Sequence, residues 1–399
     1  MIDREEIIKL VSKFQEVEFK NFIFDWALEL GPIPTELEKI VNLVSMHDSI
    51  DEEENISWEQ SLILLNKYES LGKMVKFCPI VNNLQNLILG FQWQQQNSKF
   101  RNFLPRSNIL NQENDFVWFR LIIFQNQKIN FVKNFLEQKD QPTWFEYYSL
   151  KNCTQNNNFG AVIGTPIKHS FTPIYQMHLN KYRKPFLKIN VEENNFLEYL
   201  NIFEKLKIHN LAITSPLKLI AQNFLNEVTS INTFKLIQNK WIGKNTDEVG
   251  FHKLIALEIL KKFSENEIAV WGGGGVLDII QKSLPNAQYY SIKSRKLRFQ
   301  NKSNKSNEVA NIKVVIWCAP SQLEWSEVVP PDNWIPQLII DLNYLPSSLG
   351  LRYYLLLKNK NQNNSDDYKS EVDENKVSYI NGIAMFTEQA KLQNEFWKE

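Results

Sequence analysis

The chain has few of the residues that define several classes of protein. Its 399 residues include only three cysteines (Cys78, Cys153 and Cys318), too few for a disulfide framework and without the spacing of a metal site. Lysine plus arginine (45) balances aspartate plus glutamate (45), so no overall field attracts the chain to nucleic acid or to an anionic membrane. No apolar run is long enough to span a bilayer, and the first ten residues, MIDREEIIKL, are charged where a signal peptide would be apolar. These absences predict a soluble protein of the reducing cytoplasm, with neither nucleic-acid nor membrane partners.

The length and the hydrophobic content of the chain are sufficient for two or three domains, each with its own hydrophobic core. Hydrophobic residues make up 43% of the chain and include 26 phenylalanines and 11 tryptophans. Helical periodicity is clear in WEQSLILLNKYESLG, FLEYLNIFEKLK and FHKLIALEILKKF. Strand-like runs are FIFDWALEL, IVNLVSMHD, MVKFCPI, KINFV, GAVIG, HNLAIT and EIAVW. Strands that alternate with helices predict a parallel α/β architecture throughout.

The sharpest local signal is the glycine run in EIAVWGGGGVLDII. A strand leads directly into Gly272, Gly273, Gly274 and Gly275, and a helix follows. Glycines at such a turn let the backbone approach a pyrophosphate, which then binds at the helix N-terminus. The next strand, AQYYSI, ends in a basic cluster of Lys293, Ser294, Arg295 and Lys296. An NAD site carries an acid at that place, so the basic cluster favours NADP(H).

A second signal is the stretch AVIGTPIKHSFTPIYQMH at residues 161–178. An apolar strand ends at Gly164, and several hydroxyl side chains with two prolines follow within ten residues. A surface turn needs one proline and a glycine, whereas a fixed row of hydrogen-bonding side chains is suited to a small polyhydroxylated molecule. The stretch therefore predicts a pocket for a small polar substrate.

Five fragments together resemble shikimate dehydrogenase in order and spacing. They are GTPIKHSFTP, AITSPLK, INT followed by GKNTDEVG, the GGGG turn, and the C-terminal GIAMFTEQAKLQNEFW, and they cover about residues 160–399. The resemblance implies a substrate domain completed by the last helix, a Rossmann NADP domain, and NADPH-dependent reduction of 3-dehydroshikimate to shikimate. It also leaves open a quinate dehydrogenase of the same fold, or a non-catalytic homologue whose N-terminal half is an interaction module.

The resemblance assigns roles to individual residues. Lys218 and Asp247 fall on the catalytic pair: an ammonium near the ketone can stabilise and protonate the alkoxide that hydride transfer leaves, and a carboxylate can hold and orient that ammonium. The positions that match substrate-binding residues are Ser170, Thr172, Thr214, Asn232, Tyr344 and Gln389. Two departures from the family pattern are Ala212, in place of an asparagine, and the pair Gln176 and Met177, in place of His-Asn.

The first 150 residues resemble part of type I 3-dehydroquinate dehydratase. In VNLVSMHDSIDEEE, His47 falls on the general acid/base, and in GKMVKFCPI, Lys76 falls on the lysine that forms a Schiff base. Arg120 matches the carboxylate-binding arginine and Gln141 the glutamine of the closing loop, while Asp25 matches an acid of an earlier strand weakly. The chemistry is coherent, because an iminium acidifies the adjacent C–H and an imidazole can then remove the proton.

A complete (β/α)₈ barrel needs eight strands, and only about five are expected here, so the resemblance implies a partial barrel. Three explanations are open: the chain starts too late, the half barrel pairs with a second copy that covers its sheet edges, or the domain has decayed into a scaffold. The domains expected are residues 1–149 (partial barrel), 150–159 (a polar linker), 160–252 with 378–399 (substrate domain) and 253–377 (NADP-binding Rossmann domain).

Overall fold

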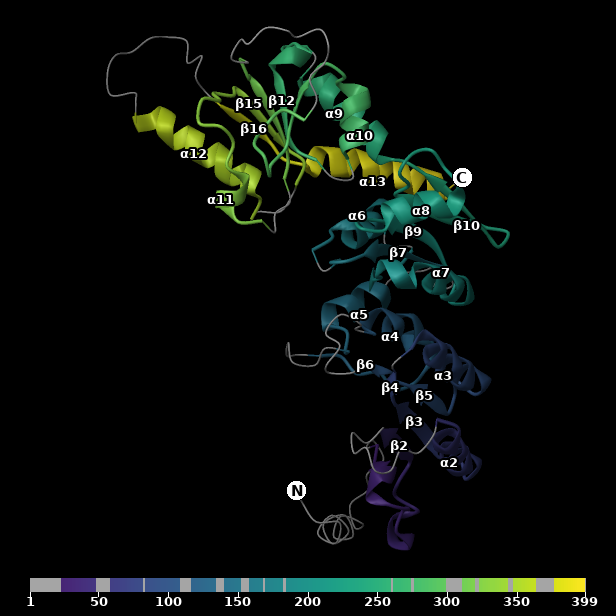
Figure 1. The fold of residues 1–399 in the computed structure, drawn as a ribbon. Coiled ribbons are helices and arrows are strands. Elements are labelled where there is room, and N and C mark those ends of the chain that lie inside the picture. The colour runs from purple at the N-terminus through teal and green to yellow at the C-terminus, as the bar shows by residue number, and fades with distance from the viewer. Residues whose placement is uncertain are drawn as a thin grey trace. The chain divides into compact units, whose positions relative to one another are not determined.

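A computed structural model of the protein describes residues 23–47, 58–81, 83–107, 116–133, 140–151, 158–167, 169–181, 184–259, 261–273, 276–298, 311–319, 323–343, 347–363 and 377–398 (Figure 1). The chain divides into two compact units, unit 1 (Met1–His209) and unit 2 (Asn210–Glu399). Among the helices described, none is long and apolar enough to cross a membrane.

Unit 1 begins with a parallel sheet of four strands. Their order is β1 (Asp25–Ala27), β2 (Leu43–His47), β3 (Met74–Cys78) and β5 (Arg101–Phe103). The helices α2 (Trp58–Ser70) and α3 (Leu84–Gln96) pack against this sheet, and the rings of Trp58 and Trp93 contact Phe77 of β3 edge-on. Because side chains alternate along a strand, the residues in register with Lys76 lie on the face opposite to Phe77. That second face carries most of the polar residues of the sheet: Asp25, Ser45, His47, Lys76, Cys78 and Asn102.

The first unit corrects one prediction and adds strands that the sequence did not suggest, among them β5. KINFV is not a strand: residues 128–132 are irregular, and Lys133 forms only an isolated bridge with Thr143. The backbone N–H groups of Lys128 and Ile129 instead donate to the side-chain oxygen of Asn102, at 3.1 and 2.9 Å. Asn102 lies on β5, so a side chain of the edge strand takes the bonds that a neighbouring strand would have made.

The remainder of unit 1 contains a second group of elements. A two-stranded parallel sheet joins β4 (Ile80–Val81) to β6 (Arg106–Ser107), and α4 (Val117–Ile123) and α5 (Trp144–Lys151) follow. The predicted strand GAVIG is β7 (Phe159–Gly164), which pairs in parallel with β8 (Phe186–Asn190). The helices α6 (Thr172–Leu179) and α7 (Phe196–Lys205) accompany them, and α7 confirms the predicted helix FLEYLNIFEKLK.

Unit 2 opens with an antiparallel arrangement, which corrects the prediction of parallel strands throughout. The two units divide within β9 (Ile208–Ile213), whose unit 2 residues pair antiparallel with β10 (Thr233–Ile237). β10 in turn pairs antiparallel with β11 (Lys240–Lys244), through a two-residue turn at Gln238 and Asn239. Both turn residues have positive φ (48° and 60°), the conformation that a tight hairpin requires.

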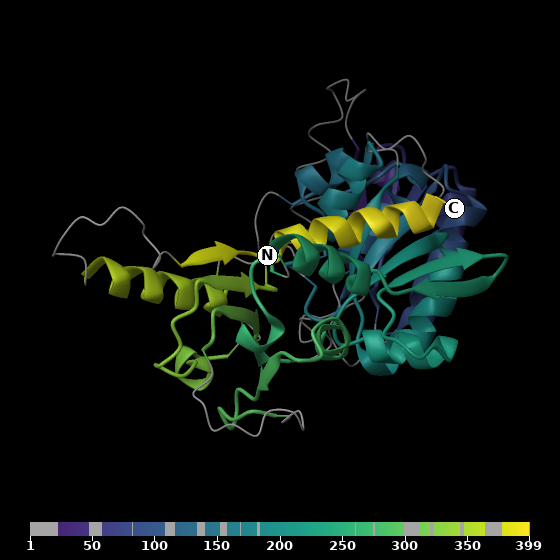
Figure 2. The same ribbon diagram turned by 90° about the horizontal axis from the view of Figure 1, so that it is seen from above.

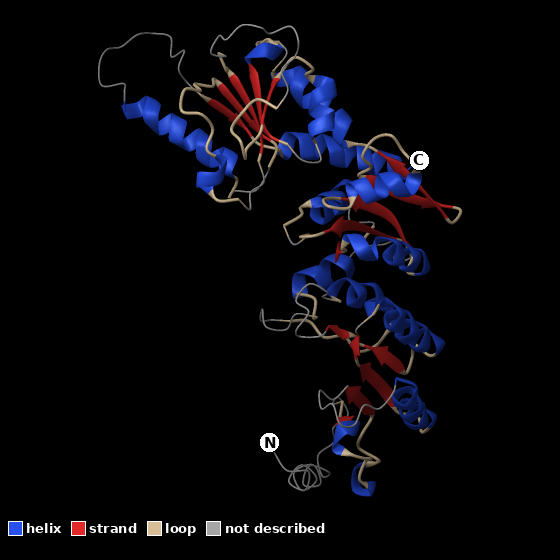
Figure 3. Cartoon of the chain, viewed as in Figure 1, coloured by secondary structure: helices blue, strands red, loops and turns tan. Residues whose placement is uncertain are grey.

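The second part of unit 2 is a doubly wound parallel sheet, as the sequence predicted. Its order is β13 (Gln288–Tyr290), β12 (Ile268–Gly272), β14 (Val314–Cys318), β15 (Leu338–Asp341) and β16 (Ser378–Ile380). One face is covered by α9 (Asp247–Glu258) and α10 (Leu277–Ser283), and the other by α11 (Trp325–Val328) and α12 (Leu349–Asn363) (Figures 1 and 3). The α/β fold class with a Rossmann-like sheet is therefore confirmed.

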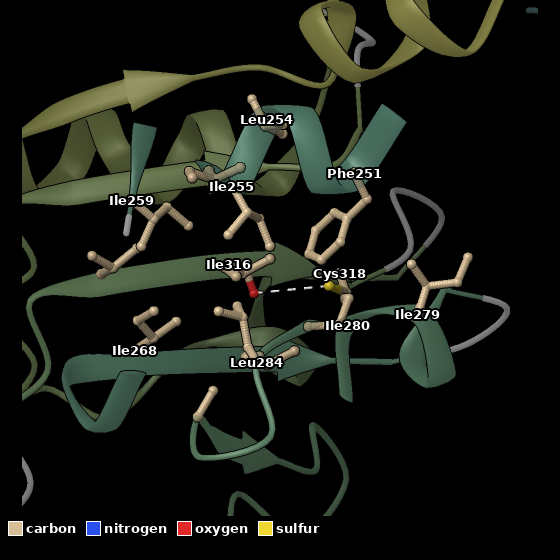
Figure 4. Packing of buried hydrophobic residues seen from close by; sticks show 14 of the residues in the cluster. Phe251, Leu254, Ile255, Ile259, Ile268, Ile279, Ile280, Leu284, Ile316 and Cys318 are labelled. Carbon is tan, nitrogen blue, oxygen red and sulfur yellow. Dashed lines mark hydrogen bonds between the residues drawn. The ribbon is translucent and has the colours of Figure 1, made fainter. Parts of the chain in front are cut away.

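The two faces of this sheet have different cores. On the α9 side, aliphatic residues such as Ile255, Ile259, Ile268 and Leu284 pack closely (Figure 4). On the α11–α12 side, the core is rich in aromatic rings, including Trp271, Trp317 and Trp334. The last helix, α13 (Ile383–Lys398), runs alongside α9 (Figure 2), where Gly250 leaves room for the close approach: a Cβ there would lie 3.1 Å from the carbonyl oxygen of Met385.

Candidate active site

The centre of the site in unit 2 is an ion pair between Lys218 and Asp247. Lys218 is the first residue of α8 (Lys218–Leu225), and Asp247 is the first residue of α9. The ammonium Nζ lies 2.5 Å from Oδ2 of the carboxylate. The Asp247 side chain is only 2% exposed, whereas that of Lys218 is 20% exposed, so the amine is the partner that other molecules can reach. The structure thus brings together the two residues that the resemblance assigned to catalysis.

Asn232 connects this ion pair to the β10 hairpin. Its Nδ2 donates to Oδ1 of Asp247 at 2.8 Å and to Oγ1 of Thr246 at 2.9 Å. Its Oδ1 accepts from the backbone N–H of Thr246 at 2.9 Å and from the hydroxyl of Thr233 at 3.0 Å. Asn232, Thr233 and Thr246 are all fully buried. Each carboxylate oxygen of Asp247 therefore has its own donor, which fixes the carboxylate in one orientation.

Neighbouring residues complete the hydrogen bonding around Asp247. The Oδ1 of Asn245 accepts from the backbone N–H groups of Asp247 and Glu248 at 3.0 and 3.2 Å, while its buried Nδ2 has no partner among the residues that the structure describes. A carboxylate at the start of a helix is also favoured by the helix dipole. Sequence reasoning missed Asn245, Thr246 and Thr233, although the first two belong to the NTD string that identified Asp247.

Two further predicted substrate residues of unit 2 are half-buried. Thr214 follows β9, and its carbonyl oxygen accepts from the N–H of Leu217 at 3.0 Å, closing the turn that leads into α8. Gln389 lies on α13, opposite Gly250 of α9. The substituted position Ala212 is buried in β9. Tyr344, predicted to line the cleft, lies outside the described residues.

The glycine turn has the geometry that its sequence predicted, as far as the structure describes it. Gly272 ends β12 with φ +97°, and a Cβ there would lie 3.0 Å from the backbone of Cys318 and Ala319 at the end of β14. Only glycine fits such a position without strain. The turn lies between β12 and β14, where the strand order reverses and where open α/β sheets bind ligands. Gly273 is described, whereas Gly274 and Gly275 lie outside the described residues.

The basic cluster follows β13, and its residues are exposed. Ser294 and Lys296 lie in this turn, and the guanidinium of Arg295 donates to the carbonyl oxygen of Ser326 at 2.8 Å. Arg298, which was not predicted, approaches the glycine turn: a Cβ on Gly273 would lie 3.0 Å from its Nη1. The signal for it was present, because the basic run continues from Lys296 to Arg298 with one residue between them.

In unit 1, the predicted carboxylate-binding hydroxyls lie next to each other. The hydroxyl of Ser170 donates to Oγ1 of Thr172 at 3.1 Å and accepts from the backbone N–H of Thr172 at 3.3 Å. Thr172 is the first residue of α6 and Pro173 the second, so the turn leads directly into the helix. Gln176 and Met177, the two departures from the family pattern, are buried on α6.

The polar face of the N-terminal sheet gathers most of the residues predicted for the dehydratase-like half. The ammonium of Lys76 is paired with the carboxylate of Asp25 and lies 5.3 Å from the ring centroid of Phe131. Lys76 has a side-chain exposure of 7%, while Asp25 has 32%. Ser45, opposite Lys76 in the register, is buried, and its hydroxyl has no partner among the described residues.

His47 lies at the end of the same face, between a carboxylate and a thiol. Its Nδ1 is 3.6 Å from Oε2 of Glu29, and Oε1 of the same carboxylate accepts from the backbone N–H of His47. Its partner in the β2–β3 register is Cys78. Hydrogen bonding to Cys78, and then to Glu29, raises the pKa of His47 to about 9 in spite of partial burial. Burial acts to raise the pKa of Glu29, but its bonds to His47 outweigh this and the net pKa is lowered. The sequence suggested neither Glu29 nor Cys78 as a neighbour of His47.

The other two residues of this half are placed differently. Arg120 is buried in α4, where its guanidinium donates to the carbonyl oxygen of Pro105 at 3.0 and 3.1 Å, and burial lowers its pKa. These bonds give the guanidinium a structural use. Gln141 is half-buried and precedes α5.

Comparison with known proteins identifies the sequence relatives of the chain. No protein-family model matches it. It is 37% identical over 147 residues to the shikimate dehydrogenase (NADP(+)) of Pelagibacter ubique, covering 33% of this chain and 53% of that protein. It is 34% identical over 140 residues to the shikimate dehydrogenase (NADP(+)) of Vesicomyosocius okutanii, and the match covers 32% of this chain and 52% of that protein. The chain is thus homologous to shikimate dehydrogenases. It spans about half the length of these curated relatives.

The solved structures that resemble this chain have lower sequence identity to it than these curated relatives. The shikimate dehydrogenase of Aquifex aeolicus is 18% identical, covers 60% of this chain and 92% of its own, and has a TM-score of 0.42. A structure of dehydroquinate dehydratase and shikimate dehydrogenase from S. pombe is 17% identical, covers 98% of this chain and 79% of its own, and has a TM-score of 0.39.

Proposed function

We propose that this chain reduces 3-dehydroshikimate to shikimate with NADPH. The observation that carries the proposal is the Lys218–Asp247 pair, in which a buried and fully hydrogen-bonded carboxylate holds a more exposed ammonium. The homology to shikimate dehydrogenases supports the same activity. Under this proposal residues 160–252 with 378–399 bind the substrate and residues 253–377 bind the cofactor.

The residues of unit 2 supply the acid–base chemistry that the reaction needs. NADPH, when bound, supplies the hydride. Reduction of a ketone places negative charge on the carbonyl oxygen, which the ammonium of Lys218 stabilises and then protonates. Asp247 holds and orients the ammonium through its ion pair. Asn232, Thr214 and Gln389 are uncharged, as suits the hydroxyl groups of the ring, while Ser170 and Thr172 remain the predicted ligands of the substrate carboxylate.

The glycine turn supports binding of a dinucleotide. Gly272 has a backbone conformation that other residues rarely adopt, and the turn lies at the reversal of strand order. The exposed cations near it, from Arg295 to Arg298, suit the 2′-phosphate of NADP(H) better than a free ribose hydroxyl. Gly273, Ser294 and Lys296 are assigned to the same cofactor.

The test is consumption of NADPH by the full chain in the presence of 3-dehydroshikimate, followed at the nicotinamide absorbance band. Turnover is expected, and its absence in protein that binds NADPH would favour the non-catalytic homologue. Parallel assays with NADP⁺ and either shikimate or quinate distinguish a shikimate dehydrogenase from a quinate dehydrogenase by the ratio of kcat/KM values.

A second candidate activity belongs to the N-terminal sheet. Lys76 is buried beside Ser45, whose hydroxyl lacks a partner among the described residues, and a polar ligand on this face would satisfy that hydroxyl. We propose that 3-dehydroquinate forms a Schiff base with Lys76 and that His47 acts as the acid/base of its dehydration. At pH 7 His47 is protonated, so it first donates a proton and acts as a base only at higher pH. Arg120 and Gln141 remain the predicted ligands of this substrate.

Borohydride reduction in the presence of 3-dehydroquinate tests this second activity. The expected result is a stable adduct on the peptide that contains Lys76, detected by mass spectrometry. An unmodified Lys76 would contradict the assignment without affecting the dehydrogenase proposal. Pairing with a second copy and a cytoplasmic location both stay predictions from the sequence.

A further inference from the structure

A buried carboxylate that neither proposed activity uses lies at the end of β15. Asp341 is fully buried, and four uncharged groups donate to it. Its Oδ1 accepts from the backbone N–H of Asn343 at 2.9 Å and from Nδ2 of the same residue at 3.1 Å. Its Oδ2 accepts from the hydroxyl of Ser348 and, at 2.9 Å, from that of Tyr379. An ionised carboxylate has about four acceptor sites, so these bonds use its full capacity.

The four bonds join elements that are separate in the sequence. Asn343 follows β15, Ser348 precedes α12, and Tyr379 lies on β16. Gly350 lets the start of α12 approach closely, because a Cβ there would lie 2.5 Å from Oδ2 of Asp341. Burial raises the pKa of this carboxyl, which means that a negative charge is unfavourable at this place. What the group contributes is therefore a fixed arrangement of these elements rather than a charge.

The two residues that follow this carboxylate are fixed on both sides. The backbone N–H of Leu342 donates to the carbonyl oxygen of Trp317 at 3.0 Å. The Nδ2 of Asn343 donates to the carbonyl oxygen of Ala319, also at 3.0 Å, just after β14. The carbonyl oxygen of Asn343 accepts from the backbone N–H of Gly382 at 3.1 Å, just before α13. Residues 342–343 are thus held between β14 and α13.

The strand register places residues 342–343 at the same edge of the sheet as the glycine turn. Trp317 of β14 pairs with Asp341, and Cys318, the next residue, pairs with Gly272. Leu342 therefore lies level with the turn, two strands away, which is about 10 Å across the sheet. The basic cluster follows β13, on the other side of β12. A dinucleotide whose 2′-phosphate binds that cluster would extend its nicotinamide end over β14 and β15.

We propose that Asp341 is a positioning residue for the nicotinamide end of the cofactor, and that it acts through residues 342–343. The inference rests on the proposed use of NADPH and adds the group that shapes this half of the site. The carboxylate fixes residues 342–343 before the cofactor arrives, so binding does not have to order them. Without it, the nicotinamide end loses a fixed surface, while the adenosine end keeps its own contacts.

The experiment compares two ligands that differ in the nicotinamide end. NADPH contains it, whereas adenosine 2′,5′-bisphosphate does not. Isothermal titration calorimetry on the full chain measures both dissociation constants. In Asp341→Ala the value for NADPH should rise about tenfold, the equivalent of one hydrogen bond at the upper end of its usual net contribution. The value for adenosine 2′,5′-bisphosphate should change by less than about twofold, because a general loss of structure would weaken both ligands alike.

Further variants keep the test decisive where Asp341→Ala does not fold. Asn343→Ala removes the side chain that links Asp341 to β14 and should weaken NADPH binding about threefold, with the same selectivity. Asp341→Asn should keep the affinity for NADPH within about twofold, because the hydroxyls of Ser348 and Tyr379 can accept as well as donate. Asp332→Asn changes an exposed acid of the same unit and should alter neither value. Circular dichroism and thermal unfolding establish that each variant is folded.

The possible results separate this inference from the proposed function. Equal weakening of both ligands, or unchanged NADPH binding in folded Asp341→Ala or Asn343→Ala, would overturn the positioning role and leave the dehydrogenase proposal standing. A loss in Asp341→Asn as large as that in Asp341→Ala would also overturn it, because the charge would then be the useful property. A wild-type chain that binds neither ligand would overturn the inference together with the proposed use of NADPH.

Discussion

Each unit of the chain contains a lysine–aspartate pair near the end of a strand, and the two pairs are built in opposite ways. In unit 2 the buried partner is the carboxylate of Asp247 (2% exposed) and the more open partner is Lys218 (20%). In unit 1 the buried partner is Lys76 (7%), and Asp25 is 32% exposed. Under the two proposed activities, the same two residue types prepare an amine for two different roles. An exposed ammonium can donate a proton to a substrate, whereas a buried amine can act as a nucleophile once it is neutral.

The surroundings strengthen this contrast. Both oxygens of Asp247 have donors, and Asn232 and Thr246 fix them within a buried network, so this ion pair is preorganised as it stands. Beside Lys76, the hydroxyl of Ser45 has no partner among the described residues. The carboxylate of Asp247 thus has both oxygens bonded. Each site also keeps one buried donor with no partner among the described residues, the Nδ2 of Asn245 in unit 2 and the hydroxyl of Ser45 in unit 1.

The largest effect is expected from Lys218→Met. Without the ammonium, the reduction of 3-dehydroshikimate loses its proton donor, and kcat should fall by about 10²- to 10⁴-fold. The measurement is NADPH consumption at saturating substrate. Lys253→Met is the matched control, because Lys253 pairs with Glu388 at 2.7 Å on the surface of the same unit, and its kcat should be unchanged. Equal activity of the two variants would contradict the role of Lys218.

Asp247→Asn should have the next largest effect. The amide has nearly the same shape, but it removes the charge that holds the ammonium of Lys218 and leaves Asn232 facing an amide. We expect kcat to fall by about 100-fold, the low end of the range for acid–base catalysis. KM should change less, and a loss of affinity with unchanged kcat would show that Asp247 serves binding alone.

Asp25→Asn tests the contrast most directly, because its expected effect has the opposite sign. Removal of the carboxylate breaks the ion pair that holds the Lys76 nitrogen, so Schiff-base formation at Lys76 should rise about three- to tenfold at pH 7. The measurement is the yield of borohydride-trapped adduct with 3-dehydroquinate. A lower yield in folded protein would mean that both acids support their lysines in the same way.

The smallest effect is expected at His47. Because hydrogen bonds to Cys78 and Glu29 raise its pKa to about 9, the imidazole should remain protonated at pH 7 and titrate near pH 9. Any step that uses His47 as a base should therefore accelerate as the pH rises toward 9. Cys78→Ala removes one of the two partners and should move the NMR titration midpoint of the His47 ring toward 6.5. A wild-type midpoint near 6.5 would contradict this account.

Local patterns predicted many elements and several site residues. The helices α2, α7 and α9 and the strands β7, β9 and β12 lie where periodicity placed them. The prediction failed where a side chain competes with the backbone, as Asn102 does for residues 128–129, and at the β10–β11 hairpin, where positive φ at Gln238 and Asn239 reverses the chain. The strand β5 was missed because RNF is short and carries no periodic signal.

The sequence alone determined the fold class and the glycine turn, and it predicted Lys218, Asp247 and Lys76, while Asp25 was only a weak match. These depend on the order of apolar and polar residues along the chain, which is local information. Only the tertiary structure decided which partner of each ion pair is buried, that Arg298 approaches Gly273, and that Cys78 lies beside His47. Burial and cross-strand pairing depend on residues distant in sequence, and they set the pKa of a group such as the imidazole of His47.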